Sequence, residues 1–269
     1  MTRGRPRPRP PRRLRRPPGH IDLTRVAGLA AVAALFANSP ERVERLFFLG
    51  ERGTDVESFC QELARRRKPY RRVGVDELAR VAGTAMHGGV VALARPRPVL
   101  PFDPDMAESW RKRAPLVLAL DGIGNPHNLG AIVRTAAFFG LDRLIVSDHP
   151  AQAGPSDAAH RVAEGGLEFV QIYRAAGLPD VLRRLKPAYR VIGAALGTGR
   201  PVEQIRIDRP ILLVLGNEEA GLDAASMAAC DEIVTLPGSG WVQSLNVAAT
   251  AAILIHYFTR VGGTAPLRR

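Results

Sequence analysis

Near its C-terminus the chain reads Leu236-Pro-Gly-Ser-Gly-Trp-Val-Gln-Ser-Leu-Asn-Val-Ala-Ala-Thr250, a glycine-rich loop that runs into an apolar helix. Two other polar loops lie upstream, Asn125-Pro-His-Asn-Leu-Gly-Ala-Ile-Val-Arg-Thr135 and Leu215-Gly-Asn-Glu-Glu-Ala-Gly-Leu222. Each loop follows an apolar stretch that is typical of a buried strand. Open α/β sheets bind their ligands in loops at the carboxyl ends of their strands. The three loops therefore predict one shared ligand site.

Around these loops, short apolar strands alternate with helical patterns. The predicted strands cover residues 116–120, 144–146, 168–173, 190–195, 211–215 and 232–236. The predicted helices cover residues 129–139, 157–163, 178–185, 224–228 and 245–259. Nearly continuous Leu, Val and Ile in the first, fourth and fifth strands is typical of strands that are covered on both faces. The pattern predicts an α/β fold with a parallel sheet covered by helices.

The chain divides into four parts. Residues 1–22 form an Arg/Pro-rich tail, and residues 23–95 predict a small α/β domain that begins with a helix over residues 26–37. Five prolines and mixed charge over residues 95–115 predict an exposed linker, placed at 96–113. Residues 114–262 then form the domain that carries the three loops.

Most of the formal charge of +12 lies in the tail, because residues 1–18 hold eight arginines, six prolines and no acidic residue. Such a segment cannot form a packed core, so we expect it to be disordered. Composition alone leaves open whether it binds nucleic acid or is only solvated. No apolar run is long enough to span a membrane, and the first residues resemble no targeting signal. We expect a soluble, cytoplasmic protein without a membrane partner.

Metal, hydrolase and dinucleotide chemistry are not supported by the sequence. The six histidines and two cysteines show no spacing typical of a metal site. Ser239 lacks the Gly-x-Ser-x-Gly context of a hydrolase. In the third loop Gln243 occupies the place of the last glycine of G-x-G-x-x-G, which argues against a dinucleotide site.

Several polar residues of the three loops are candidates for chemistry. Asn128 is placed to cap the helix that follows it, and Ser244 is predicted as the N-cap of the last helix, with Asn246 in its first turn. Arg134 lies among apolar neighbours near a helix start, where an anion such as phosphate is a natural ligand. Glu218 follows a central strand, where it could accept hydrogen bonds from a ligand or orient a side chain.

In order and spacing, the three loops resemble the three motifs of the SPOUT superfamily of RNA methyltransferases, in the TrmH or SpoU branch that methylates the ribose 2′-hydroxyl of tRNA or rRNA. The first domain resembles the L30e-like substrate-binding domain of some members through Val26-Ala-Gly-Leu-Ala-Ala-Val-Ala-Ala-Leu-Phe36 and His87-Gly-Gly-Val-Val91. The likeness covers roughly residues 23–260. Many members have Met after the proline that corresponds to Pro237, whereas this chain continues to Trp241, a departure that bears on target identity.

The resemblance implies a deep trefoil knot, a homodimer, an RNA substrate and S-adenosylmethionine as methyl donor. It implies contact with this cofactor near Leu196, Gly197, Gly216, Leu236 and Leu245. It also implies a set of catalytic or substrate-contacting residues, namely Asn128, Arg134, Glu218, Ser244 and Asn246. It implies no metal.

The resemblance makes Arg134 the central catalytic candidate. A guanidinium keeps its proton at neutral pH. We therefore expect Arg134 to grip the target phosphate and to stabilise the developing alkoxide, with Asn128 and Glu218 orienting it. The alternative to an active enzyme is a catalytically silent RNA-binding or ribosome-assembly protein that retains the knotted domain. The intact set of catalytic candidates favours the enzyme.

Overall fold

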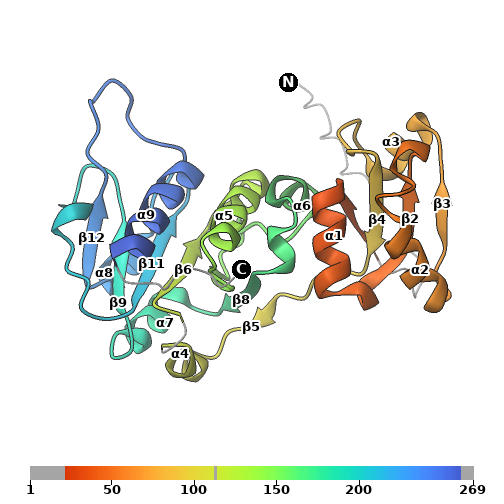
Figure 1. Ribbon diagram of the computed structural model, residues 1–269. Coiled ribbons are helices and arrows are strands. Elements are labelled where there is room, and N and C mark those ends of the chain that lie inside the picture. Colours follow the sequence, from red (N-terminus) through yellow and green to blue (C-terminus); the bar gives the residue numbers. More distant parts are fainter. Residues whose placement is uncertain (1–21, 112–113, 262–269) are drawn as a thin grey trace, which may run out of the picture.

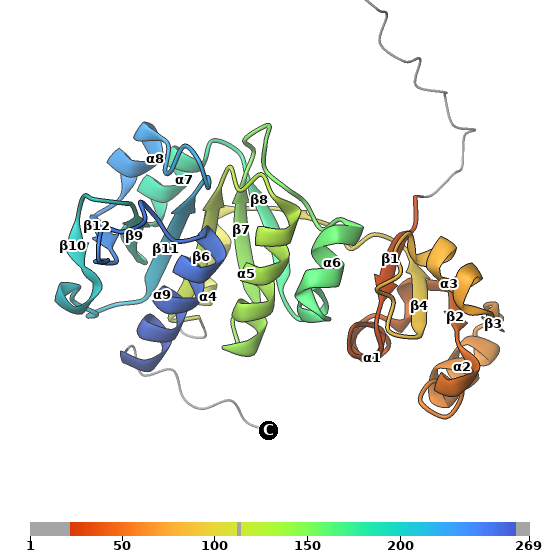
Figure 2. The ribbon, with the colours of Figure 1, turned by 90° about the horizontal axis from the view of Figure 1, so that it is seen from above.

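The computed structural model describes residues 22–111 and 114–261, which fold around two sheets (Figure 1). The predicted tail, apart from Asp22, lies outside the described residues. A four-stranded sheet with three helices forms the N-terminal domain, and an eight-stranded sheet with helices on both faces forms the larger domain (Figures 1 and 2).

The small sheet has the order β1-β4-β2-β3, in which β3 pairs parallel to β2 and the other pairs are antiparallel. The elements of this domain are β1 (Thr24–Ala27), α1 (Leu29–Asn38), η1 (Pro40–Arg42), β2 (Val43–Phe48), η2 (Gly50–Arg52), α2 (Glu57–Arg65), β3 (Tyr70–Arg72), α3 (Val75–Ala82) and β4 (Val90–Ala94).

The predicted helix over residues 26–37 is wrong at its start, because residues 24–27 form β1. Gly28, at φ 95°, separates this strand from α1. Such a backbone angle suits glycine and interrupts a helix. The apolar run that predicted one helix is therefore divided between the end of a strand and a helix.

The large sheet has the order β10-β12-β9-β11-β6-β7-β8-β5, and every neighbouring pair is parallel. This confirms the predicted parallel α/β fold. Its elements are β5 (Leu100–Pro101), α4 (Pro104–Trp110), β6 (Leu116–Asp121), α5 (Pro126–Phe138), β7 (Arg143–Ser147), α6 (Asp157–Ala163), η3 (Gly166–Glu168), β8 (Gln171–Ala175), α7 (Leu178–Leu185), β9 (Arg190–Ala194), β10 (Arg200–Pro201), η4 (Val202–Gln204), β11 (Ile211–Gly216), α8 (Ala224–Ala229), β12 (Glu232–Thr235) and α9 (Val247–Val261).

The central strands divide their side chains between two cores because successive residues of a strand point to opposite faces. In β6, Leu118 and Leu120 join the core beneath α5, α6 and α9, whereas Val117 and Ala119 join the core beneath α4, α7 and α8. Figure 2 shows these two layers of helices on opposite faces of the sheet. Burial on both faces explains the near absence of polar residues in β6 and β11.

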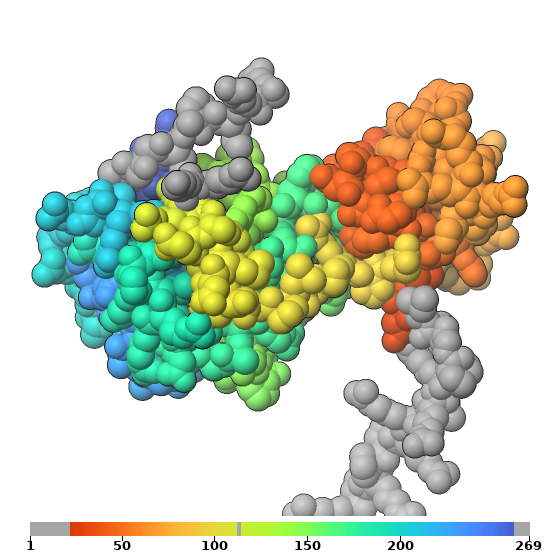
Figure 3. Space-filling view, turned by 90° about the horizontal axis from the view of Figure 1, so that it is seen from below, coloured from red at the N-terminus to blue at the C-terminus, as the bar shows by residue number. Residues whose placement is uncertain are grey.

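Part of the predicted linker 96–113 packs on the large domain, although many of its described residues are exposed as predicted. Its β5 pairs with β8 at the edge of the large sheet, and α4 packs on the same domain. Trp110 is 6% exposed, and its ring centre lies 5.5 Å from that of Phe102 and 5.0 Å from that of Tyr173. Packing of these aromatic side chains therefore holds the segment against the large domain despite its prolines. Figure 3 shows the segment, in yellow, running along the large domain and across the narrow waist between the domains.

A buried group of charges joins the two domains at this waist. Arg42 Nη1 donates to Glu168 Oε2 at 2.6 Å, and Arg97 Nη1 lies 3.5 Å from the same oxygen. The Glu168 side chain is fully buried, and burial lowers the pKa of Arg97, with the Arg42 charge acting in the same direction. At the rim, Arg25 forms an exposed ion pair with Asp157 at 2.8 Å. A specific polar interface thus holds the N-terminal domain against the large one.

His160 lies beside this charged group and predicts how the stability of the protein depends on pH. It is 2% exposed, and burial, assisted by the Arg42 charge, lowers its pKa from 6.5 to about 4. Between these two values the unfolded chain binds more protons, so the folded state loses stability as the pH falls. The loss approaches roughly 3 kcal/mol at about pH 4, from 1.36 kcal/mol per pKa unit. Urea unfolding at pH 7 and at pH 4 should show that the wild type loses more unfolding free energy between these pH values than His160→Leu does. An equal loss in the two proteins would contradict this prediction.

Among the described residues, none of the helices has the length and apolar character to cross a membrane. The described residues also contain no group of three or more His, Cys, Asp or Glu side chains that could hold a metal ion.

Candidate functional site

The three loops identified in the sequence meet at one edge of the large sheet. In the strand register, Leu215 of β11 and Val234 of β12 both pair with Ala194 of β9, while Gly216 pairs with Asp121 of β6. The strands are parallel, so β6, β9, β11 and β12 all end at the same level, at the carboxyl end of the sheet. The loop after β6, the loop after β11 and the start of α9 therefore surround a common site, as the sequence predicts.

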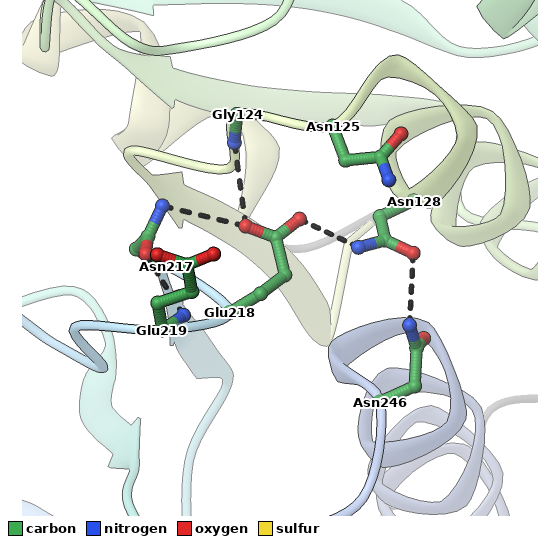
Figure 4. A pocket seen from close by; sticks show the side chains of 7 residues that line it. All are labelled: Gly124, Asn125, Asn128, Asn217, Glu218, Glu219 and Asn246. Atoms are coloured by element: carbon green, nitrogen blue, oxygen red, sulfur yellow. Dashed lines mark hydrogen bonds between the residues drawn. The ribbon is translucent and has the colours of Figure 1, made fainter.

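A cavity of about 530 Å³ lies between these three segments. Figure 4 shows its lining, in which polar groups predominate. The lining residues are Gly124, Asn125, Asn128, Asn217, Glu218, Glu219 and Asn246.

The Glu218 carboxylate is the centre of the hydrogen bonds in this cavity. Its Oε1 accepts from Asn128 Nδ2 at 2.6 Å. Its Oε2 accepts from Gly124 N at 3.4 Å and from Asn217 Nδ2 at 3.3 Å. Both carboxylate oxygens are thus engaged by donors, and the side chain ties the loop after β11 to the loop after β6.

Asn128 and Asn246 extend this network to the third loop. Asn246 Nδ2 donates to Asn128 Oδ1 at 3.0 Å, and Asn246 Oδ1 accepts from Ala248 N at 2.8 Å. Three of the predicted residues, Asn128, Glu218 and Asn246, therefore form one continuous chain of hydrogen bonds (Figure 4). An amide fits the middle of such a chain because it donates and accepts at the same time.

Two predicted helix caps are wrong. Asn125, rather than Asn128, caps α5, because its Oδ1 accepts from His127 N at 2.9 Å. Asn246, rather than Ser244, accepts from the first turn of α9, which begins at Val247. Ser244 is exposed in the loop before the helix. Asn128 is thereby free for its contacts with Glu218 and Asn246.

Asn217 is a further residue of this cavity, next to the predicted Glu218. Its Nδ2 donates to Gly122 O at 2.8 Å, while its Oδ1 accepts from Glu219 N at 2.9 Å and from Ala220 N at 3.0 Å. Asn217 thus closes the turn that presents Glu218 and ties this turn to the end of β6. An Asn directly after a buried strand and before a turn is a signal that could have identified it.

Gly216 is required by close packing within the same turn. A Cβ at this position would lie 2.3 Å from backbone atoms of Gly221 and Leu222. We therefore expect Gly216→Ala to lower the free energy of unfolding by about 1–3 kcal/mol, as overpacking does. Gly238→Ala is the matched control, because a Cβ there would contact nothing within 4 Å. Equal unfolding free energies for the two variants in urea titrations would refute this assignment.

Arg134 does not join the network in the cavity. It lies further along α5, where its Nη2 forms an ion pair with Glu164 Oε2 at 2.9 Å; more than half of each side chain is exposed. The expectation that Asn128 and Glu218 orient Arg134 is therefore wrong within this chain, since those two side chains bond to each other. The guanidinium is instead exposed at the surface of α5, where it pairs with Glu164.

Most of the residues expected near the cofactor lie at or just beyond the carboxyl ends of the same strands. Leu196 and Leu236 each stand two residues beyond the paired Ala194 and Val234, and Gly216 ends β11 between β9 and β6. Leu196 is 56% exposed and Leu245 47% exposed, and a Cβ at Gly197 would meet open space. Apolar side chains beside free backbone could hold a group with both an apolar and a polar part. The described residues thus fit such a cofactor.

The comparison with protein families agrees with this geometry. Residues 115–256 match the SpoU rRNA Methylase family, and residues 25–100 match the family described as RNA 2′-O ribose methyltransferase substrate binding. The chain belongs to the SpoU rRNA methylase family. This membership confirms the family that the three loops resemble.

Relatives within the SpoU rRNA methylase family match over nearly the whole chain. The 23S rRNA (guanosine-2′-O-)-methyltransferase RlmB of Acinetobacter baylyi is 35% identical over 238 residues, which are 85% of this chain and 94% of that protein. The uncharacterized tRNA/rRNA methyltransferase YfiF of Escherichia coli O157:H7 is 34% identical over 86% of this chain and 66% of that protein.

Solved structures of SpoU methyltransferases and related enzymes share the fold. An rRNA methyltransferase from Sinorhizobium meliloti superimposes with a TM-score of 0.73 at 21% identity, over 91% of this chain and 89% of that one. The SpoU methyltransferase AviRb from Streptomyces viridochromogenes, crystallised in complex with AdoMet, gives a TM-score of 0.70 at 24% identity, over 91% and 92%.

Proposed function

We propose that this member of the SpoU family transfers a methyl group from S-adenosylmethionine to a ribose 2′-hydroxyl of ribosomal RNA. The observation that carries the proposal is the chain of hydrogen bonds from Asn246 through Asn128 to Glu218, which draws three loops around one polar cavity beside an apolar sheet edge. The names of the RlmB relatives favour a guanosine of 23S rRNA as the target.

The cofactor would lie against Leu196, Gly197, Gly216, Leu236 and Leu245. When bound, it supplies a methyl group on a sulfonium that a nucleophilic oxygen can attack. The hydrogen-bond network holds the loops from β6 and β11 and the start of α9 in fixed relation. Such fixed placement is what a displacement reaction requires of the protein, because it depends on alignment of the reacting groups.

Arg134 would bind the RNA phosphate next to the target ribose and stabilise the 2′-oxygen while it forms its bond to the methyl group and its proton passes to solvent. Its present partner Glu164 does not prevent this, since an exposed ion pair contributes at most about 1 kcal/mol. A phosphate can therefore replace that carboxylate. Ser244, exposed in the third loop, is available to the RNA rather than to the helix.

The role of Arg134 predicts different results for two substitutions. Arg134→Lys keeps the positive charge but loses the two parallel hydrogen bonds that a guanidinium offers to a phosphate. We expect its kcat/KM for RNA to fall by about tenfold, and that of Arg134→Ala to fall further. Methyl-transfer assays at saturating cofactor would measure this. A near-normal rate for Arg134→Lys would exclude two-pronged binding of phosphate.

A homodimer and the trefoil knot remain part of the same proposal. Trp241, Val242 and Leu245 expose 93%, 72% and 47% of their surface in the third loop, which suits contact with a second copy, a base or the adenine. Sedimentation equilibrium should give a mass of about twice 29.1 kDa. A monomer at micromolar concentration would contradict the dimer.

The substrate is tested by supplying purified protein with S-adenosylmethionine labelled in the methyl group and, separately, with 23S rRNA, 16S rRNA and total tRNA. We expect label in 23S rRNA made without modification and none in 23S rRNA already modified at the same ribose. Label in tRNA alone would show that the substrate is tRNA rather than rRNA. Cofactor binding without transfer to any RNA would favour the silent RNA-binding protein.

A further inference from the structure

The outer edge of the N-terminal domain carries an exposed basic ridge that the active-site proposal does not use. It comprises residues 65–72, Arg-Arg-Arg-Lys-Pro-Tyr-Arg-Arg, from the end of α2 through a turn to the end of β3. All eight residues are exposed except Lys68, which is half-buried. β1 contacts α6 of the large domain, whereas β3 is the opposite edge of the small sheet (Figure 1). The basic ridge therefore faces away from the large domain.

The six cations of the basic ridge exceed the carboxylates that face them. Glu62 pairs with both Arg65 and Arg66, while Lys68 pairs with Glu44 and Arg71 with Glu77. Arg67 and Arg72 have no carboxylate within 4.0 Å among the described residues. An excess of three positive charges results, and the exposed pairs are weak enough for a phosphate to compete with them.

An aromatic side chain stands within this charge. Tyr70 is 44% exposed, and it begins β3, between Pro69 and Arg71. Tyr70 pairs with Leu46 in the sheet, so its backbone is fixed although its ring remains open to solvent. An exposed aromatic on a strand, flanked by cations, is the combination on which unpaired bases stack while their phosphates are neutralised. Double-stranded RNA offers phosphates but no free base face.

We propose that the basic ridge docks a single-stranded segment of the RNA substrate, with a base on Tyr70 and phosphates at Arg67 and Arg72. This proposal deepens the proposed function and rests on RNA being the substrate. Because the ridge and the catalytic cavity lie on different domains, the same RNA must reach around the small domain. That requirement suits a large folded RNA with an unpaired loop more than a short hairpin.

The test measures binding of fluorescein-labelled ten-nucleotide single-stranded RNA and of a 23S rRNA transcript to the full chain. Three variants are compared with the wild type: Arg67→Gln with Arg72→Gln, Tyr70→Ala, and Tyr70→Phe. Arg183→Gln with Arg184→Gln is the control that removes the same charge, because those exposed arginines of α7 already pair with Asp180 and Asp105. All the side chains concerned are exposed, so we expect unchanged Tm values.

The double ridge variant should bind single-stranded RNA about 25-fold more weakly at 0.1 M salt, and its salt slope should fall by about 1.4, which is 0.7 for each cation. Tyr70→Ala should weaken binding by about tenfold, whereas Tyr70→Phe should stay close to the wild type. In methyl-transfer assays the KM for RNA should rise in the double variant while kcat is kept. The arginine control should change binding by less than about threefold.

Wild-type affinity in both ridge variants, or an equal loss in the arginine control, would overturn the proposal. A ten-base-pair duplex RNA serves as a further probe. The proposal would also be overturned if Tyr70→Ala weakened binding to this duplex as much as it weakens binding to the single strand. Failure of the proposed function is distinguishable, because the wild type would then bind the oligonucleotide through the ridge and yet transfer no methyl group.

Discussion

Replacing Glu218 by Gln should lower kcat for methyl transfer by at least about 100-fold. Gln has the same size, but its amide nitrogen is a donor, and both oxygens of Glu218 face donors from Asn128, Gly124 and Asn217. One of these contacts must therefore break, and the loop after β11 must shift relative to α5. A displacement of about 1 Å in a positioning group can cost on the order of 100-fold in rate.

The neighbouring carboxylate provides the matched control for this prediction. Glu219 also lines the cavity, but its carboxylate has no hydrogen-bond or ion-pair partner among the described residues. We expect Glu219→Gln to keep kcat within about threefold of the wild type. Stopped assays at saturating RNA and cofactor would compare the two variants. If Glu218→Gln retained more than a tenth of the wild-type kcat, the network would not be what positions the loops.

Replacing Glu168 by Ala should lower the free energy of unfolding by about 3–5 kcal/mol. Its fully buried carboxylate is the only one within 4.0 Å of Arg42 and of Arg97 in the described part of the chain. Removing it leaves two largely buried guanidinium groups without a counter-charge, which is the costly way to break a buried ion pair. Urea unfolding at pH 7 would measure the loss.

Two further variants separate this effect from a general loss of charge. Asp180→Ala breaks an exposed pair with Arg183 and should change the unfolding free energy by less than about 1 kcal/mol. Glu168→Leu combined with Arg42→Met removes two of the three charges and should recover part of the stability that Glu168→Ala loses. A Glu168→Ala protein within 1 kcal/mol of the wild type would show that the contact between the domains is not held by these charges.

The central sheet and the meeting of the three loops could be predicted from the sequence, because strands buried on both faces leave continuous apolar runs. The structure confirms strands at the predicted places in β6, β9 and β11, with boundaries that differ by a residue at most. Strands β5 and β10 have two residues each and carry no periodicity that a sequence could show. They are defined only by the neighbours with which they pair.

Three members of the candidate site were predictable from the sequence, but their contacts were not. Glu218 comes just after β11, while Asn128 lies in the first turn of α5 and Asn246 directly precedes α9, and such positions are visible in the sequence. The pairing of Asn128 with Glu218 joins residues 90 positions apart, and Arg42 reaches Glu168 across 126 positions. Ser244 and Asn246 are both good helix caps, so only the observed start of α9 distinguishes them.

The chemical position of the methyl group tests the central claim most directly. 23S rRNA transcribed without modification would be incubated with the protein and S-adenosylmethionine, digested to nucleosides and analysed by mass spectrometry, with Arg134→Ala protein as the comparison. We predict a single nucleoside that carries its added methyl on the ribose 2′-oxygen, formed by the wild type and nearly absent with Arg134→Ala. A methyl group on a base, or equal product from both proteins, would contradict the account.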